Sequence, residues 1–209
     1  MLVEALGLAA ELDLAVAGLA SDAAAFSTVP IAFNVSGQSL QNAAFLDRLI
    51  ALLSASPSLR AGRMIIEMTE TTEVENITEV RRAAEALRAI GVPFCLDDFG
   101  AGAADMRLLR ALPADMVKLD GSYVSGVVHE RRERGFVAGM VDIARAVGAA
   151  VVAERIETEV EAEALLAVGA TYGQGWLFGR PAALPTARPT TLSQVPSTPR
   201  RRTVKESQQ

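Results

Sequence analysis

Only one cysteine and one histidine occur among the 209 residues of the sequence. A single cysteine, Cys95, excludes an intramolecular disulfide and is typical of a protein from a reducing compartment. A single histidine, His129, excludes zinc centres and metal hydrolase sites in which several imidazoles or thiolates converge on one ion. Any metal ion bound by this chain must therefore be held by oxygen ligands.

Long hydrophobic runs and a basic amino-terminal segment are also missing. No stretch reaches the roughly 18 to 20 uninterrupted apolar residues that a membrane-spanning helix needs. The first residues, Met-Leu-Val-Glu, lack the basic region of a signal peptide. The sequence therefore predicts a cytoplasmic protein without a membrane span.

Positive charge is scarce in most of the chain. The net charge is −5, and residues 187–209 alone carry five basic residues against one acidic residue, net +4, which leaves −9 on residues 1–186. This balance disfavours nucleic-acid binding, because phosphate groups are neutralised by clustered Lys and Arg on a folded surface. An acidic protein binds a phosphate-bearing ligand more readily when divalent cations mediate the contact.

Short β-type runs alternate with longer helical patterns, which is typical of an α/β fold with a parallel sheet. Six runs are predicted as strands: Ile31–Ser36, Arg63–Met68, Val92–Asp97, Met116–Asp120, Ala149–Glu154 and Thr171–Phe178.

Amphipathic helices are predicted between most of these runs. Asn76 and Glu79 have the spacing of a capping box before a helix that stops at Gly91, and Thr158 and Glu161 have the same spacing before a later helix. Between them an apolar stripe predicts a buried helix face, formed by Phe136, Met140, Ile143 and Val147.

The composition changes after Gly179. Five prolines lie between Pro181 and Pro199 among Ser, Thr, Arg and Gln residues, and such a segment cannot pack into a core. We therefore expect one domain over residues 1–185 and a disordered tail over residues 186–209, to which we assign no function.

Polar residues stand where the predicted strands end: Asn34, Glu67, Asp97, Asp98, Lys118, Asp120, Glu154 and, within the last run, Gln174. In parallel α/β sheets and barrels, ligands bind at the carboxyl ends of the strands. Carboxylates brought together there repel one another and are costly to desolvate. One or two hard divalent cations such as magnesium, manganese or calcium would compensate them.

Each polar residue also has a purely structural explanation as a turn residue, a helix cap, an exposed acid or half of an internal ion pair. The Asp97–Asp98 pair is the hardest to explain in this way. It ends a buried-looking strand and precedes Phe-Gly-Ala-Gly, so it needs either backbone caps or a cation.

Taken together, six ordered motifs resemble those of the EAL domain family of bacterial cyclic-di-GMP phosphodiesterases. The motifs are Phe33-Asn34-Val35-Ser36, Ile66-Glu67-Met68-Thr69-Glu70, Leu96-Asp97-Asp98-Phe99-Gly100, residues 112–120 (Leu-Pro-Ala-Asp-Met-Val-Lys-Leu-Asp), Ala153-Glu154-Arg155-Ile156-Glu157-Thr158 and residues 173–181 (Gly-Gln-Gly-Trp-Leu-Phe-Gly-Arg-Pro).

The resemblance implies a TIM-like (β/α)8 barrel that hydrolyses cyclic di-GMP to linear pGpG with Mg²⁺ or Mn²⁺. Such a reaction needs no histidine base, because metal ions lower the pKa of bound water. Carried over by position, the metal ligands are Asn34, Glu67, Asp97, Asp98 and Asp120, the catalytic groups that position and activate water are Glu154 and Lys118, the substrate-binding residues are Gln174 and Glu157, and the anchor of the loop after Asp98 is Glu70.

The sequence departs from the family pattern at its amino-terminal end. The family's Glu-Ala-Leu strand, whose glutamate ligates a metal ion, lies well upstream of the Asn motif, but only 33 residues precede Asn34. Glu4-Ala5-Leu6 lies too close to Asn34 and is interpreted as a coincidence. With six of eight strands, the barrel is expected to be incomplete and to lack this ligand and a neighbouring substrate-binding arginine.

Two further departures lie within the motifs. Residues 101–105, Ala-Gly-Ala-Ala-Asp, replace the family's Thr-Gly-Tyr-Ser-Ser loop, which couples metal binding to dimerisation. Arg155 replaces a glycine and is expected to pair with the adjacent Glu154. We therefore expect weak or no turnover.

Several interpretations remain open. One interpretation is that the true protein starts upstream and the chain is a truncated or mis-started version of an active enzyme. The other is a shortened, degenerate module that acts as a cyclic-di-GMP receptor or a protein-interaction module. A homodimer or a partner protein would cover the open barrel edge. A barrel enzyme acting on another phosphorylated metabolite is the alternative of a different class.

Overall fold

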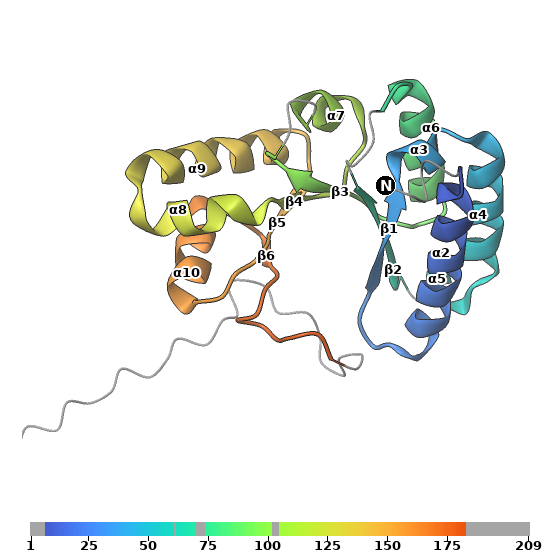
Figure 1. The fold of residues 1–209 in the computed structure, drawn as a ribbon, viewed down its shortest axis with the longest axis horizontal. Helices are drawn as coiled ribbons and strands as arrows, with labels where there is room; N and C mark the ends of the chain where they lie inside the picture. The colour runs from blue at the N-terminus through green and yellow to red at the C-terminus, as the bar shows by residue number, and fades with distance from the viewer. Residues whose placement is uncertain (1–6, 61, 70–73, 102–104, 183–209) are drawn as a thin grey trace, which may run out of the picture.

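The computed structural model describes residues 7–60, 62–69, 74–101 and 105–182. Helices and strands alternate along the chain, as Figure 1 shows. In order, the elements are α2 (Ala9–Phe26), β1 (Ile31–Ser36), α3 (Gly37–Leu40), α4 (Ala43–Ala55), α5 (Pro57–Arg60), β2 (Met64–Thr69), α6 (Ile77–Ala89), β3 (Phe94–Phe99), α7 (Asp105–Ala111), β4 (Met116–Leu119), η1 (Gly121–Tyr123), α8 (Val124–His129), α9 (Arg131–Ala146), β5 (Ala150–Ala153), α10 (Glu159–Val168) and β6 (Tyr172–Gly173).

The six strands form one parallel sheet in the order β1-β2-β3-β4-β5-β6. Each strand pairs with the next in sequence, so every connection returns the chain to the same end of the sheet. The carboxyl ends of all six strands therefore lie along one edge. This arrangement confirms the α/β fold and the six predicted strands, with β1 and β6 at the two ends of the sheet.

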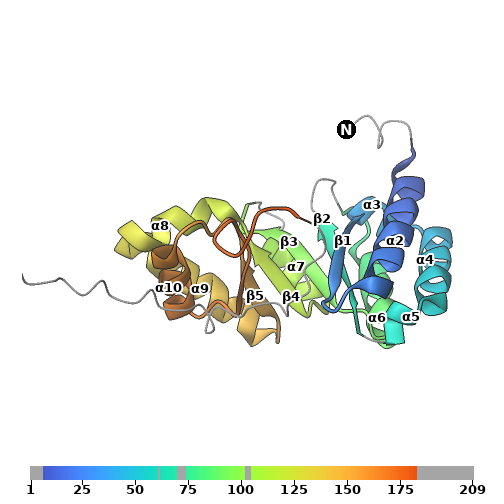
Figure 2. The same cartoon turned by 90° about the horizontal axis from the view of Figure 1, so that it is seen from below.

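The sheet has one buried face and one partly open face. Alternate residues such as Val35, Ile66 and Val117 are fully buried against the helices. Figures 1 and 2 place α2, α4, α5 and α6 at the β1 end and α8, α9 and α10 at the β5–β6 end. The residues between the buried ones, including Asn34 and Glu67, point to the opposite face, because side chains alternate along a strand.

Both predicted helix starts are present, with one difference. Thr158 accepts a hydrogen bond from Glu161 N while the Glu161 side chain accepts from Thr158 N, a complete capping box. Asn76 likewise accepts from Glu79 N. The Glu79 carboxylate, however, pairs with Arg82 at 2.8 Å. An arginine one turn later offers an ionic partner to the carboxylate, so the cap remains one-sided.

The apolar stripe predicted for α9 is confirmed at Met140, which is buried, and is wrong at its other three residues. Phe136, Ile143 and Val147 are about half exposed, while the buried face consists of Val137, Met140, Val141 and Ala144. The small and β-branched residues of this second stripe suit the close approach of a helix to a sheet. Phe136 stacks on Tyr123 at the surface, with ring centroids 5.8 Å apart.

The last predicted strand is also wrong in its extent. The run expected over Thr171–Phe178 pairs with β5 only at Tyr172 and Gly173. Gln174 continues with one hydrogen bond to Ala153 O, and the chain then turns because Gly175 packs against the backbone of Ile156, where a Cβ would collide. The segment after Gln174 therefore leaves the sheet.

Some predictions fall outside the described residues. Glu70 and the tail over residues 186–209 belong to this group. Among the helices that the structure describes, none has the length and apolar character needed to cross a membrane.

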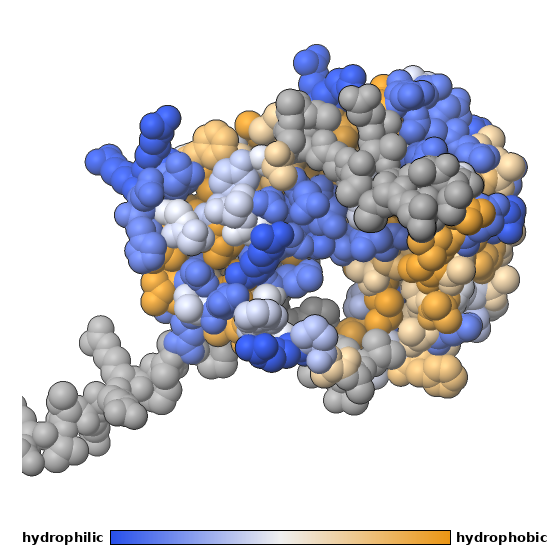
Figure 3. All heavy atoms as spheres, viewed as in Figure 1, coloured by the Kyte–Doolittle hydropathy of each residue, from blue (hydrophilic) through white to orange (hydrophobic). Residues whose placement is uncertain are grey.

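Exposed hydrophobic side chains gather on α2. Leu12, Leu19 and Phe26 are 49%, 71% and 89% exposed, and Figure 3 shows hydrophobic residues over this side of the molecule. The opposite face of α2 packs on β1 and α4 through Leu14 and through small residues such as Ala17. The partner that would cover the open edge of the sheet remains a prediction.

Shortening a buried side chain in the core beneath the sheet should destabilise the fold. Leu49 of α4 is fully buried, whereas Leu19 of α2 is 71% exposed. We expect Leu49→Ala to lower the free energy of unfolding by about 2 to 5 kcal/mol, because the deletion leaves a cavity. Leu19→Ala is the matched control and should change it by less than about 0.5 kcal/mol. Urea unfolding measures both, and equal losses would contradict the packing described.

Candidate metal and phosphodiester site

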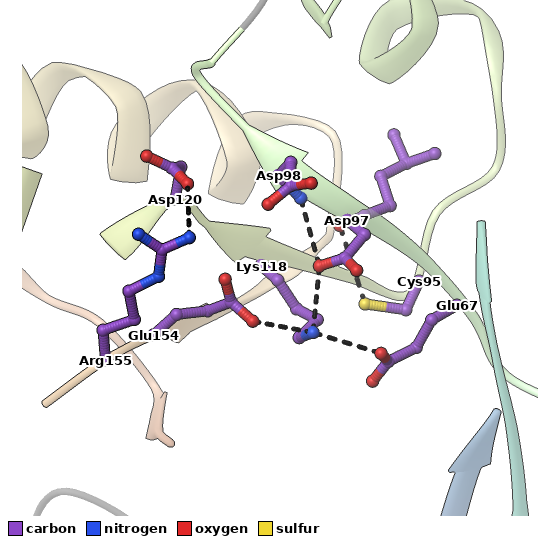
Figure 4. Close-up of polar contacts among 9 residues, drawn as sticks. Glu67, Cys95, Asp97, Asp98, Lys118, Asp120, Glu154 and Arg155 are labelled. Carbon is purple, nitrogen blue, oxygen red and sulfur yellow. Dashed lines mark hydrogen bonds and ion pairs between the residues drawn. The ribbon is translucent and has the colours of Figure 1, made fainter. Parts of the chain in front are cut away.

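Four charged residues from four neighbouring strands meet at the carboxyl edge of the sheet. Glu67 lies in β2, Asp97 in β3 and Lys118 in β4, and Glu154 follows β5 directly. Each occupies a position that points away from the helix layer, and Figure 4 shows their side chains converging. The alternation of strand side chains and the parallel order of the sheet thus bring together residues up to 87 positions apart.

The Lys118 ammonium lies at the centre of this group. Its Nζ is 2.7 Å from Glu154 Oε1, 2.9 Å from Asp97 Oδ1 and 3.1 Å from Glu67 Oε2 (Figure 4). Only 8% of the lysine side chain is exposed. All three N–H donors of the ammonium therefore have a carboxylate within reach.

The surroundings shift the protonation equilibria of this group. Burial alone would lower the pKa of Lys118, but hydrogen bonds to Glu154 and Asp97 and the charge of Glu67 raise it above its usual range. Burial raises the pKa of Glu67; Lys118 opposes this, and the charges of Asp97 and Glu154 add to it. Three carboxylates thus share a single ammonium.

Two more acids form a neighbouring group with Arg155. Asp98 has a positive φ of 52°, and its N–H donates to Asp97 Oδ1 at 3.1 Å. Asp120 Oδ1 accepts from Ser122 N at 2.9 Å, and its Oδ2 is 3.9 Å from Arg155 Nη2. The expectation that Arg155 pairs with Glu154 is therefore wrong. The backbone of Arg155 turns its side chain toward Asp120 instead, which leaves Glu154 to Lys118.

The surroundings shift the pKa values of Asp98 and Asp120 in opposite directions. Burial raises the pKa of Asp98, and the charges of Asp97 and Asp120 raise it further. Burial acts in the same sense on Asp120, but hydrogen bonds from Ser122 and the charge of Arg155 lower its pKa overall. Asp98 therefore carries the less compensated negative charge of the two.

The oxygen atoms of this edge fit a hard divalent cation. Asp97, Asp98 and Glu154 each offer one carboxylate oxygen, and these three atoms lie within 4.8 Å of one another. Such a spacing suits ligands around one ion at the oxygen–metal distances of Mg²⁺ or Mn²⁺. The acidic cluster could therefore hold a metal ion.

The remaining predicted site residues lie near the edge without joining the central group. Asn34 stands opposite Glu67 in the β1–β2 register, with an exposed side chain. Gln174 and Glu157 also have exposed side chains. Their backbones hold the local structure, since Gln174 N donates to Ala153 O and Glu157 N donates to the Glu161 side chain. These contacts fit the structural explanations of both residues.

Cys95 lies beneath the acidic group and is 1% exposed. Burial raises the pKa of its thiol, and the negative charge of Glu67 adds to the effect. The thiol is therefore protonated and unreactive. Cys95 is therefore a buried packing residue beneath the site.

Asp13 of α2, which no sequence motif singled out, fixes the end of β1. Asp13 Oδ2 accepts hydrogen bonds from Ser36 N at 3.0 Å and from Ser36 Oγ at 2.9 Å. Ser36 in turn caps α3 by accepting from Ser39 N. The bond joins residues 23 positions apart, and the only sequence signal for it is a polar residue on an otherwise apolar helix face.

The chain is similar to known proteins of one family. The model of the EAL domain family matches residues 1–181. The chain is 34% identical over 154 residues to the cyclic di-GMP phosphodiesterase PdeB of Shewanella oneidensis, covering 74% of this chain and 18% of that protein. It is also 34% identical over 153 residues to the cyclic di-GMP phosphodiesterase PdeF of Escherichia coli, covering 73% and 20%. The chain thus spans about a fifth of these curated relatives.

Solved structures resemble the fold. The PaMucR phosphodiesterase in complex with c-di-GMP is 30% identical with a TM-score of 0.76, and the match covers 87% of this chain and 81% of that one. Klebsiella pneumoniae BlrP1, solved as a manganese and cy-diGMP complex, is 30% identical with a TM-score of 0.66, covering 83% and 44%. On the match of 181 of its 209 residues to the family model, this chain belongs to the EAL domain family of cyclic-di-GMP phosphodiesterases.

Proposed function

We propose that this chain binds cyclic di-GMP at the carboxyl edge of its sheet and hydrolyses one phosphodiester bond slowly, with Mg²⁺ or Mn²⁺, to give pGpG. The observation that carries the proposal is the contact of Lys118 with three carboxylates from three other strand ends, at 2.7 to 3.1 Å. Two related structures support the substrate and the metal, since PaMucR was solved as a c-di-GMP complex and BlrP1 as a manganese and cy-diGMP complex.

The charge balance of the edge supports metal binding. Glu67, Asp97 and Glu154 face one ammonium, and the weakly compensated Asp98 lies beside them. An excess of negative charge in a partly buried site is unfavourable until a cation neutralises it. A divalent ion held by Asp97, Asp98 and Glu154 would remove most of this excess.

In the proposed hydrolysis each residue of the site has a separate role. A bound divalent ion lowers the pKa of water and neutralises charge on the phosphoryl oxygens. Glu154 is placed to accept the proton of the attacking water, and Lys118 holds its carboxylate in position through the 2.7 Å contact. Glu67 and Asp97 fix the ammonium from the other side.

The openness of the sheet supports a low rate. Ala32 and Asn34 of β1 are exposed on the face that bears the site, so water reaches the polar groups from the β1 end. Preorganised charges stabilise a transition state best where water is excluded. We therefore propose slow hydrolysis for these 209 residues, and a faster reaction where further chain covers β1.

Turnover of cyclic di-GMP tests the proposed reaction. Incubation with cyclic di-GMP and Mn²⁺, followed by chromatography of pGpG, should show slow product formation. Glu154→Gln should reduce it at least about 100-fold, because the variant keeps the size of the side chain but cannot accept a proton and is a weaker, uncharged metal ligand. Glu163→Gln, an exposed acid on α10, is the matched control and should leave the rate unchanged.

Other outcomes distinguish the alternatives. Product formation that survives Glu154→Gln would mean that this edge does not carry the chemistry. Ligand-induced stabilisation without turnover would replace the enzyme with a cyclic-di-GMP receptor. Neither turnover nor stabilisation would leave a protein-interaction module.

The free energy of unfolding of Lys118→Met, measured in EDTA to remove metal ions, tests the contribution of the ammonium. Without the ammonium, the carboxylates of Glu67, Asp97 and Glu154 lose their partner, and we expect a loss of about 3 to 5 kcal/mol at pH 7. Burial already raises the pKa of Glu67, and loss of Lys118 removes the charge that opposes this rise. Protonation of such groups favours the folded state, so the deficit should shrink as the pH falls from 7 to 5.

Urea unfolding at both pH values tests this prediction. Arg131→Met, which removes an exposed cation at the start of α9, is the control and should show a small deficit at either pH. A Lys118→Met deficit of equal size at pH 5 and pH 7 would contradict the proposed coupling.

A further inference from the structure

A β-bulge lies at the end of β3, next to the site. In the pairing of β3 with β4, two residues of β3, Asp97 and Asp98, lie opposite the single residue Lys118. Bulges of this kind re-aim side chains, and here they allow two adjacent acids to face the same group. One carboxylate oxygen of each acid and one of Glu154 lie within 4.8 Å of one another (Figure 4). The proposed metal site therefore depends on the shape of this bulge.

The burial of β3 shows what the bulge changes. Leu96 and Phe99 are 4% and 2% exposed, so both belong to the core although they are three positions apart. Strict alternation would place Asp98 in the core with Leu96 and turn Phe99 outward. The bulge exchanges these two side chains, and Asp98 takes a positive φ of 52°. A residue with a Cβ keeps this conformation only where its surroundings hold it.

Three successive carbonyl groups after the bulge each accept a hydrogen bond. The carbonyl of Asp98 accepts from Ala101 N at 3.1 Å, and the next one accepts from Asp120 N at 3.2 Å. The third, that of Gly100, accepts from the Tyr123 hydroxyl at 2.6 Å. The first two donors are backbone groups, which every residue except proline offers. The third donor is a side chain, so it depends on the sequence.

Tyr123 is held in the position from which it makes this bond. It ends η1, directly after β4, and its ring stacks on Phe136 of α9 with ring centroids 5.8 Å apart. The ring also lies against Gly100, where a Cβ would collide with Tyr123 and with Met140. Gly100 has a φ of 101°, so a glycine is needed there both for its backbone and for lack of space. Donor and acceptor are therefore both fixed before any ligand binds.

We propose that Tyr123 is a positioning residue whose hydroxyl holds the bulge in the shape that presents Asp98 to a metal ion. It acts through the backbone of Gly100 and is not itself a ligand. Groups that orient metal ligands contribute strongly to metal affinity. This inference rests on the proposed metal-dependent function and deepens it, because it names a residue outside the acidic group that sets the affinity of the site.

The experiment compares Mn²⁺ binding by Tyr123→Phe and by the unaltered chain, with free Mn²⁺ measured by electron paramagnetic resonance in the absence of nucleotide. The variant keeps the ring that stacks on Phe136 and removes only the hydroxyl. We expect the dissociation constant to rise about 3- to 10-fold, which corresponds to the loss of one neutral hydrogen bond. Tyr172→Phe removes the exposed hydroxyl of the other tyrosine, on β6, and is the matched control that should leave the constant unchanged.

Thermal unfolding separates positioning from a general loss of stability. In EDTA, Tyr123→Phe should unfold within a few degrees of the unaltered chain, because one hydrogen bond has a modest net effect. Mn²⁺ should then raise the midpoint less in the variant, since stabilisation by a ligand decreases as its dissociation constant rises. A purely structural role would lower the midpoint by the same amount with and without Mn²⁺.

A double-mutant cycle tests whether Tyr123 acts through Asp98. Asp98→Asn keeps the shape of the side chain and tolerates a positive φ, but it removes the charge of the ligand. In this background, Tyr123→Phe should weaken Mn²⁺ binding by less than about twofold, because residues that act through one another are not additive.

The outcomes distinguish the role of Tyr123 from the proposed function. Equal Mn²⁺ affinity in Tyr123→Phe and the unaltered chain, or an undiminished loss in the Asp98→Asn background, would overturn the role of Tyr123 and leave metal-dependent hydrolysis standing. No Mn²⁺ bound by the unaltered chain would overturn both.

Discussion

The structure depends on one ammonium group placed among three carboxylates. Lys118 joins the carboxyl ends of β2, β3 and β5 to β4 through contacts of 2.7 to 3.1 Å. A buried carboxylate without a partner is strongly unfavourable, and so is a buried ammonium. The four strand ends are therefore stable at this spacing only as a group. The same contacts that hold the edge of the sheet together also fix the geometry of the proposed site.

The hydrophobic core and the polar site lie on opposite faces of the sheet. Val35, Ile66 and Val117 pack against the helices and carry the hydrophobic free energy of the core. The residues that alternate with them point the other way and are free to be polar. A slip of one residue in the register of any strand would exchange the two sets, so the core itself protects the geometry of the site.

Much of the fold could be predicted from sequence because its signals are local. The strand Ile31–Ser36 and the capping box at Thr158 depend on neighbouring residues and were predicted correctly. The orientation of α9 was not, because two apolar stripes compete on that helix and only contact with β5 decides between them. The end of β6 depends on the close approach of Gly175 to Ile156, which is a tertiary contact.

For the site, too, the local features could be predicted from sequence and the tertiary contacts could not. The polar residues at strand ends could be found from sequence, since each follows an apolar run. Their partners could not be assigned correctly, because adjacency in sequence suggested that Arg155 would pair with Glu154. A positive φ at Arg155 reverses the direction of its side chain, and Gly121 leaves space for its stem. The assignment of charges across the edge thus depends on backbone conformation rather than on the motif.

Two demands on the edge conflict with each other. A site that binds a dication and stabilises a charged transition state gains from exclusion of water, since charges interact more strongly in a low dielectric. The exposed side chain of Asn34 lies in contact with water, which weakens these interactions. Fixed cations such as Lys118 and Arg155 reduce the conflict, because they are covalently attached and need not be captured from solution. The acidic residues can therefore stay close together next to water, where ions bound from solution would stabilise them less than the attached cations do.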